Sequence, residues 1–237
     1  MGSKLDNLEE VNSFSAKIYG KSDHHIDSES LECPVHADIV EAIQTLKNEA
    51  AHAGFSLTLA SGFRSFDRQC LIWNAKAQGL RPVLDKNENP INLNDLNEQE
   101  KVFAILRWSA LPGTSRHHWG TDFDVYDASA LEDEKALQLT VKETLKGGPF
   151  FSFYQWLNKY LKQKNTHFFR PYEKDLGGVS PEPWHLSHQP VAFEFEKAFN
   201  IDELKDLLLA SDLLLKDAVI ENLDEIHQKF VTNISKA

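Results

Sequence analysis

Two histidines, an aspartate and a glutamate stand in short motifs whose spacing suits a catalytic metal. The segment SRHHWGTDFD contains His117 and, seven residues later, Asp124, and the segment EPWH contains Glu182 and His185. Catalytic zinc sites take three protein ligands from His, Asp, Glu or Cys and leave one position for water. His117, Asp124 and His185 are therefore candidate ligands for one zinc ion, and the sequence has no copy of the helical HExxH motif.

These residues would support hydrolysis of a peptide bond. Zinc lowers the pKa of a bound water from about 15.7 toward about 7 and polarises the scissile carbonyl. Glu182, held extended by Pro183, would take the proton of the water and pass it to the leaving amine, which accelerates a reaction by roughly 10²–10⁴-fold. Arg64 in SGFRSF is suited to a free carboxylate, because its planar guanidinium pairs with carboxylate in a bidentate way.

The residue pattern around these motifs predicts alternating helices and strands without an internal repeat. Apolar residues at helical spacing predict helices, and alternating apolar and polar residues predict half-buried strands. Helices are expected over 35–53, 66–78, 98–108 and 150–162, and strands or extended segments over 55–60, 121–127, 166–172 and 183–188. The pattern is typical of an α+β protein with a small antiparallel sheet that bears the zinc site and is packed by helices.

Two further segments complete this organisation. Residues 79–97 carry two prolines and five asparagines and have little periodicity, so we expect a long loop that is part of a binding site or a lid. Residues 201–234 contain two apolar helical stretches, which we interpret as an appended helical hairpin. The prediction is one zinc peptidase domain over 1–237, with a motif core at 55–190 and the hairpin at 200–237.

Composition and charge limit the possible partners and compartments. The chain has 36 acidic and 25 basic residues and a formal net charge of −11, so nucleic acid is not an expected partner. No stretch approaches the roughly 20 apolar residues of a membrane span. The start, MGSKLDNLEEVNSF, lacks the layout of a secretory signal. The location is therefore periplasmic or in the cell envelope if a leader was removed, and otherwise cytoplasmic.

The motifs together resemble those of the VanY-type D-alanyl-D-alanine carboxypeptidases, zinc peptidases related to lysostaphin-like endopeptidases and the hedgehog signalling domain. The family block SGYRS, followed by a Gln, is matched by residues 61–65 and Gln69. The block SxHxxGxAxD is matched by Ser115, His117, Gly120 and Asp124, and an ExxWH-like block is fitted by Glu182, Trp184 and His185. The blocks occur in the family order.

The resemblance implies a role for each matched residue. It implies one zinc ion held by His117, Asp124 and His185, with Glu182 as the catalytic base. It further implies that Arg64 orients the substrate and that Ser115 and Gln69 contact it. The implied substrate is a peptidoglycan stem peptide or the D-Ala-D-Ala dipeptide.

Two positions depart from the family pattern. Phe63 replaces the commoner Tyr, which removes a hydroxyl. Asp122 stands where the family usually has Ala, two residues before a ligand and on the same face of the expected strand. Asp122 would either orient a zinc ligand, as carboxylates commonly do for histidine, or meet a cationic group of the substrate.

Several functions share such a site. A D,D-carboxypeptidase is favoured because an arginine near the site suits a free carboxylate, but an L,D-carboxypeptidase, a D,D-dipeptidase and a peptidoglycan endopeptidase are alternatives. A non-catalytic zinc-containing binding module is an alternative of another class, against which Glu182 argues because binding needs no base. The oligomeric state is left open, with the hairpin as a dimer surface or a lid.

The other reactive residue types are expected to be structural. His118 should point away from the metal, and His188 should lie at the surface. Five more histidines are expected to be solvated: His24, His25, His36, His52 and His227. Trp119 and Trp184 are expected to form pocket walls. Cys33 and Cys70 are either two small buried hydrophobic residues or a single disulfide.

Overall fold

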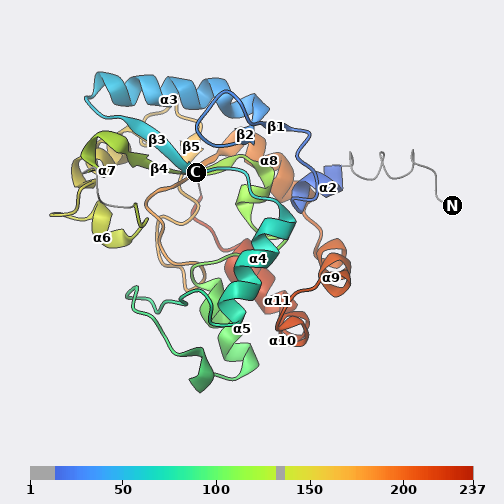
Figure 1. Ribbon diagram of the computed structural model, residues 1–237. Helices are drawn as coiled ribbons and strands as arrows, with labels where there is room; N and C mark the ends of the chain where they lie inside the picture. Colours follow the sequence, from blue (N-terminus) through green and yellow to red (C-terminus); the bar gives the residue numbers. More distant parts are fainter. Residues whose placement is uncertain (1–13, 132–136, 237) are drawn as a thin grey trace.

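A four-stranded antiparallel sheet lies at the centre of the molecule (Figure 1). The computed structural model describes residues 14–131 and 137–236. In spatial order the strands are β3 (Leu57–Ser61), β4 (Asp122–Asp127), β6 (His185–His188) and β5 (Phe168–Phe169). Helices pack on this small sheet, and the predicted α+β class is confirmed.

One hydrophobic cluster joins the sheet to the helices α3 (Val40–His52) and α7 (Phe151–Tyr160). In Figure 1 helix α3 runs along the sheet at the top of the molecule. Phe123 and Val125 of β4 are fully buried in this cluster. Because side chains alternate along a strand, Asp122 and Asp124 point to the opposite face of the sheet, as the sequence pattern predicts.

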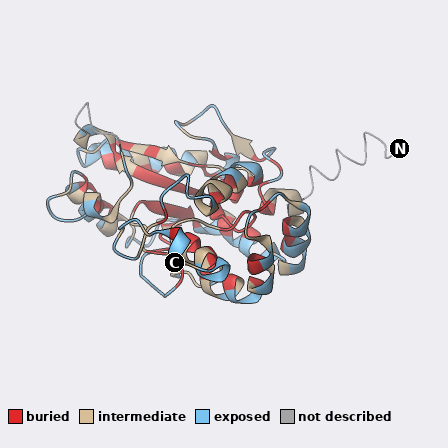
Figure 2. Ribbon diagram, turned by 60° about the horizontal axis from the view of Figure 1, so that its bottom comes forward, coloured by how far each residue is buried: buried red, intermediate tan, exposed pale blue. Residues whose placement is uncertain are grey.

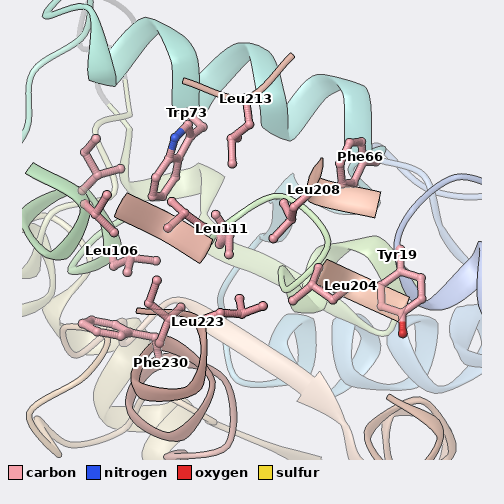
Figure 3. Close-up of a cluster of buried hydrophobic side chains, with 14 of the residues drawn as sticks. Tyr19, Phe66, Trp73, Leu106, Leu111, Leu204, Leu208, Leu213, Leu223 and Phe230 are labelled. Atoms are coloured by element: carbon pink, nitrogen blue, oxygen red, sulfur yellow. The ribbon is translucent and has the colours of Figure 1, made fainter. Parts of the chain in front are cut away.

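A second hydrophobic cluster is drawn in Figure 3, and most of the helices that form it lie below the sheet in Figure 1. It joins α4 (Phe66–Ala77) and α5 (Glu98–Leu106) to the C-terminal helix α9 (Ile201–Ala210) and the elements after it. Trp73 of α4 is completely buried there, and its indole N–H donates to the carbonyl of Leu214 at 3.0 Å. The C-terminal segment thus shares a core with helices of the motif-bearing part. The assignment of residues 1–237 to a single domain stays a prediction.

The second C-terminal stretch is not one continuous helix as its periodicity predicts. It breaks at Asn222 into α10 (Lys216–Glu221) and α11 (Leu223–Ile226), and α11 continues as a π-helical turn, η5 (His227–Val231). The side-chain amide of Asn222 donates to the carbonyl of Ala218 at 2.7 Å, so it competes with the backbone of the helix.

The remaining elements are helix α8 and a set of short segments. They are α2 (Phe14–Ile18), β1 (Ile26–Asp27), β2 (Val35–His36), η1 (Ala37–Ile39), η2 (Leu93–Asp95), η3 (Arg116–Trp119), η4 (Ala128–Ala130), α6 (Val141–Thr144) and α8 (Gln189–Ala198). Segment 79–97 is largely a loop, closed on itself by a bridge between Leu84 and Pro90. Between residues 14 and 236, leaving aside 132–136, no helix has the length and apolar character of a membrane span. Residues 1–13, which carry most of the stretch searched for an export signal, lie outside the described part.

Figure 2 shows how strongly burial concentrates in the central strands. This burial includes three histidines whose predicted exposure is wrong: His25, His36 and His188 are 8%, 9% and 6% exposed. Cys33 and Cys70 are both free and half-buried. They pack against different hydrophobic clusters, so the structure contains no disulfide between them.

Candidate active site

A tight turn and two neighbouring strands bring the three predicted ligands together. His117 lies in the 3-10 helix η3, and Gly120 ends that helix with a φ of 69° before the chain enters β4. A Cβ atom at Gly120 would lie 2.7 Å from the backbone nitrogen of His36, so only glycine fits this turn. Asp124 of β4 pairs with His185 of β6 in the antiparallel register. The turn and the register therefore aim the three side chains at one point.

His117, Asp124 and His185 form the candidate metal cluster, in which one potential ligand atom of each residue lies within 4.8 Å of the others. His117 Nε2 is 3.6 Å from Asp124 Oδ2, and His185 Nδ1 is 3.4 Å from Asp124 Oδ1. All three residues are buried. Two imidazoles and one carboxylate around a point are a donor set that zinc commonly takes.

Hydrogen bonds determine which nitrogen of each imidazole is free. His117 Nδ1 lies 2.8 Å from the carbonyl oxygen of Gly62, so in the neutral ring Nδ1 carries the proton and Nε2 keeps its lone pair. His185 Nε2 lies 3.0 Å from Asp122 Oδ1, so in the neutral ring Nε2 donates and Nδ1 keeps the lone pair. Both free nitrogens face Asp124, as ligation of a shared ion requires.

The residues present fit a cation. Asp124 Oδ1 and His185 Nδ1 are buried atoms that make no hydrogen bond with any described residue. Buried polar atoms without a partner cost free energy, and they are rare in native proteins. A divalent cation between these atoms would satisfy both, and Glu182 Oε2, which lies 3.2 Å from His185 Nδ1, adds further negative charge.

The pKa values of the cluster reflect the same concentration of acceptors. Burial alone would lower the pKa of His185, but the neighbouring carboxylates of Asp122 and Glu182 raise that pKa to about 10. Burial raises the pKa of the Asp124 carboxyl to about 6. Burial, with the nearby Arg64 charge, holds the pKa of His117 well below its ordinary range. Without a metal, the proton on His185 supplies the positive charge that the surrounding carboxylates require.

Asp122 is placed to orient His185, which decides between the two roles considered for it. Its side chain is fully buried, and it accepts from Arg116 Nε at 2.6 Å, Thr121 Oγ1 at 2.7 Å and Ser187 Oγ at 3.0 Å. Burial would raise the pKa of Asp122, but the Arg116 guanidinium and His185 bring it well below the usual range. A carboxylate with all these partners has no free oxygen for a cationic group of a substrate.

Arg116 anchors this arrangement and was not found by the sequence motifs. Its Nη1 lies 2.6 Å from Glu196 Oε1 and its Nη2 donates to Ser187 Oγ at 2.7 Å, in addition to the contact with Asp122. A signal for it exists in the sequence. Arg116 and Asp122 are opposite charges on either side of His117, within one motif whose other residues are mostly apolar or small.

Arg64 and Glu182 line the same cavity as the metal cluster, and Gln69 does not. Arg64 donates from Nη1 to Gln69 Oε1 at 3.1 Å and from Nη2 to Ser61 Oγ at 3.2 Å. Gln69 is completely buried, and its amide nitrogen donates to the carbonyl of Ala110 at 2.7 Å. The direct substrate contact expected of Gln69 is therefore not supported, and its place is behind Arg64, which it positions.

The cavity has a volume of about 280 Å³. Its lining comprises the metal cluster, other polar residues and an apolar wall: Arg64, Lys76, Leu84, Trp108, Ser109, Ala110, Ser115, Arg116, His117, Asp124, Leu139, Tyr172, Val179, Glu182, Trp184 and His185. Ser115 and Trp184 line it as expected, and Leu84 brings in the 79–97 loop. Lys76 is a lining residue that no motif indicated.

Trp119 lies elsewhere. Its indole N–H donates to the carbonyl of Ile18 at 3.0 Å, and its ring stacks on Phe195. It lines a second cavity of about 610 Å³ beyond Arg116, to which none of the candidate ligands contributes. His118, as predicted, turns away from the cluster, with Nδ1 2.6 Å from the carbonyl of Arg64 and Nε2 accepting from the Gly113 N–H at 2.9 Å.

A buried His-Asp-His cluster beside a free carboxylate is the arrangement of a metallopeptidase site. The family model VanY, D-alanyl-D-alanine carboxypeptidase, matches residues 32–191, which is more than half of the chain. The chain therefore belongs to the VanY family of peptidoglycan-acting carboxypeptidases, and the family predicted from the motifs is confirmed.

The chain is similar to two uncharacterized proteins of Haemophilus influenzae. One is 44% identical over 98 residues, which cover 40% of this chain and 67% of that protein. The other is 31% identical over 126 residues, covering 51% of this chain and 92% of that protein.

Solved structures of similar fold include three peptidases. A mutant of the vancomycin-resistance D,D-pentapeptidase VanY in complex with Zn(II) is 21% identical, with coverage of 82% of this chain and 88% of that chain and a TM-score of 0.47. VanYB in complex with D-alanine-D-alanine is 22% identical, with coverage of 76% and 87% and a TM-score of 0.48. The LD-carboxypeptidase LdcB is 18% identical, with coverage of 82% and 77% and a TM-score of 0.49.

Proposed function

We propose that this protein is a zinc-dependent carboxypeptidase of the D-alanyl-D-alanine type, which hydrolyses a terminal peptide bond in peptidoglycan stem peptides. The observation that carries the proposal is the convergence of one ring nitrogen from each of two histidines and a carboxylate beside Glu182. Membership of the VanY family supports the choice of substrate class.

His117 Nε2, His185 Nδ1 and Asp124 would hold one zinc ion. This donor set of two imidazoles and a carboxylate suits zinc better than the hard cations magnesium and calcium, which favour all-oxygen sites. When bound, zinc supplies a Lewis acid that polarises the scissile carbonyl and makes a nucleophile of water near neutral pH. Asp122 would keep the His185 ring in the orientation and the tautomer that ligation needs.

Glu182 is the general base of the proposed reaction. Its Oε2 lies 3.2 Å from His185 Nδ1, so its carboxylate borders the point at which the ligand atoms converge. From there Glu182 would accept a proton from the attacking water and deliver it to the nitrogen of the leaving D-alanine. The bond that forms joins the water oxygen to the carbonyl carbon, and the bond that breaks is the peptide C–N bond.

Arg64 and the cavity wall would position the substrate. Nη1 and Nη2 of Arg64 each use one N–H for Gln69 and Ser61, so a second N–H on each remains for a carboxylate. A free terminal carboxylate is the group that a fixed guanidinium recognises best. Trp108 and Trp184 form an apolar wall that suits the methyl groups of alanine, and Ser115 would make a polar contact to the peptide.

The test is an assay of purified protein with three substrates, each with and without a chelator and zinc add-back. The substrates are a stem pentapeptide ending in D-Ala-D-Ala, the matching tetrapeptide and free D-Ala-D-Ala, with products identified by mass spectrometry. Zinc-dependent loss of one alanine from the pentapeptide supports the proposal. Cleavage of the tetrapeptide alone would assign an L,D-carboxypeptidase, and cleavage of the free dipeptide alone a dipeptidase.

Two outcomes would contradict carboxypeptidase activity altogether. Cleavage confined to crosslinked muropeptides would make the protein an endopeptidase. Zinc binding with no cleavage of any of these substrates would favour a non-catalytic binding module.

A further inference from the structure

Lys76 is a cation in the active-site cavity that lacks an anionic partner. It lies in the last turn of α4 and lines the cavity together with Arg64 and Glu182. Within the described part of the chain its ammonium group forms no hydrogen bond and no ion pair. Lysine is rarely withdrawn from solvent unless it is paired. A half-buried, unpaired lysine in a binding cavity indicates that its partner arrives with the ligand.

The charges around Lys76 favour an anionic ligand. Burial, together with the charges of Arg81 and Arg64, lowers the pKa of Lys76 to about 8, and the charge of Glu182 opposes this shift. Lys76 therefore remains mainly protonated at neutral pH, next to two other cations. A carboxylate bound here would offset this repulsion. It would also replace the water that burial removes from the ammonium group.

Arg64 and Lys76 stand at opposite ends of α4 and line the same cavity. Arg64 precedes the first turn of α4, whereas Lys76 is in its last turn. At about 1.5 Å per residue, ten residues of helix separate the two backbone positions by roughly 15 Å. The long side chains of Arg64 and Lys76 shorten this separation between their charged groups. An extended peptide advances about 3.5 Å per residue. A peptide whose terminal carboxylate binds Arg64 could therefore present a second carboxylate to Lys76 from a residue a few positions before its C-terminus.

We propose that Lys76 binds a second carboxylate of the substrate, so that the preferred substrate is a peptide with a free acidic group two or three residues before its C-terminal residue. This inference rests on the proposed function for the peptide nature of the substrate. Leu84 and Trp108 line the cavity between the loop and the helix, and the Trp108 indole donates to the carbonyl of Asp85 at 3.0 Å, which holds the 79–97 loop beside this subsite.

The experiment compares two synthetic peptides that end in D-Ala-D-Ala and differ only in one residue, Glu or Gln, at the position before that dipeptide. A second pair moves this residue one position further from the terminus. Equilibrium binding is measured by calorimetry on the zinc-loaded Glu182→Gln variant, and kcat/KM on the otherwise unaltered protein. We expect the Glu peptide of at least one pair to bind about tenfold more tightly, as a partly buried charge pair allows.

Substitution of Lys76 then tests the residue itself. In the Lys76→Met variant the Glu-to-Gln binding ratio should fall to about one, whereas Lys76→Arg should keep most of the preference because it keeps the charge. Lys159→Met is the matched control, since Lys159 is exposed on α7, outside the lining of the cavity. It should leave the ratio unchanged.

Three results would overturn the inference. They are equal binding of Glu and Gln peptides in both pairs, an equal loss of both in Lys76→Met, and disappearance of the Lys76 effect when the peptide C-terminus is amidated. The last result would show that Lys76 binds the terminal carboxylate instead. Failure of the proposed function is distinguishable, because it would appear as absent turnover with the Lys76-dependent binding preference intact.

Discussion

The imidazole of His185 bridges the two carboxylates that strand β4 places on one face: its Nε2 lies 3.0 Å from Asp122 Oδ1, and its Nδ1 lies 3.4 Å from Asp124 Oδ1. The antiparallel register produces this relationship, because His185 pairs directly with Asp124 and is diagonal to Asp122. One carboxylate therefore orients the ring, and the other lies with it at the candidate metal position.

Replacement of Asp122 by asparagine should weaken metal binding without removing a ligand. The neutral amide of the Asp122→Asn variant would not hold His185 with a full negative charge, and loss of such an orienting partner lowers metal affinity by roughly 10–100-fold. Competition with a chromophoric chelator measures the zinc affinity of the variant.

Asp127→Asn is the matched control for this prediction, because Asp127 is also a buried carboxylate of β4. It accepts the backbone N–H of Ser56 at 2.8 Å, at the other end of the strand from the candidate metal cluster. The control should lower stability and leave zinc affinity unchanged. Equal affinities of Asp122→Asn and the unaltered protein would contradict the orienting role.

Replacement of Arg116 by methionine should destabilise the fold. Arg116 is 4% exposed and supplies the main positive charge beside the fully buried Asp122. Removal of one partner leaves an uncompensated buried charge, which costs about 3–5 kcal/mol of unfolding free energy. Chemical denaturation of the metal-free protein measures this loss.

The same prediction has a control and a pH signature. Arg68→Met removes an exposed arginine of α4 and should change stability by less than about 0.5 kcal/mol. The pKa of Asp122 lies below its unfolded value, so its contribution is present above about pH 4 and is lost as the pH falls through the folded pKa. In Arg116→Met this acid-sensitive contribution should shrink, and an unchanged acid profile would argue against the ion pair.

Metal binding should release a proton and should strengthen as the pH rises. The pKa of His185 in the metal-free protein is raised to about 10, so a metal at neutral pH must displace the proton from this ring. About one proton should therefore be released between pH 7 and 9, and affinity should rise about tenfold per pH unit. Calorimetry in two buffers with different ionisation enthalpies measures the proton count.

Two further effects of pH are expected, one on metal affinity and one on the stability of the metal-free protein. Below a pH of about 6 Asp124 binds a proton as well, so the affinity should fall more steeply there. His185 stabilises the metal-free fold fully below its unfolded pKa of about 6.5, and this contribution is lost as the pH rises towards the folded value. Zinc binding without proton release near neutral pH would show that His185 is neutral in the free protein.

Replacement of Glu182 by glutamine should sharply reduce turnover and leave zinc bound. Glu182 is not required as a ligand, since His117, Asp124 and His185 supply the donor set. Loss of a general base lowers kcat by roughly 10²–10⁴-fold. The measurement pairs kcat on the preferred peptide with the zinc content of the purified variant. Full activity of the variant would require a different base.

The family, the fold class and the candidates for the metal cluster could all be predicted from the amino-acid sequence. Short motifs contain the four residues of the candidate site, His117, Asp124, Glu182 and His185. The residue types of such a motif and their spacing can be recognised in the sequence without knowledge of the fold. The strand over 121–127 was also predictable, because alternation along it assigns Asp122 and Asp124 to one face. Their roles as ligands and base stay predictions that the experiments above address.

The contacts that support these residues could not be predicted from the sequence and became visible in the folded structure. The partner of Asp122 depends on the register of β4 against β6, which pairs residues more than 60 positions apart. Gln69 proved to lie behind Arg64, because the helix that carries it buries that face. Lys76 belongs to the cavity for a similar reason, since a single charge on an amphipathic helix gives no local sign of what it faces. Such contacts arise between distant segments, and the periodicity of one segment contains no information about the other.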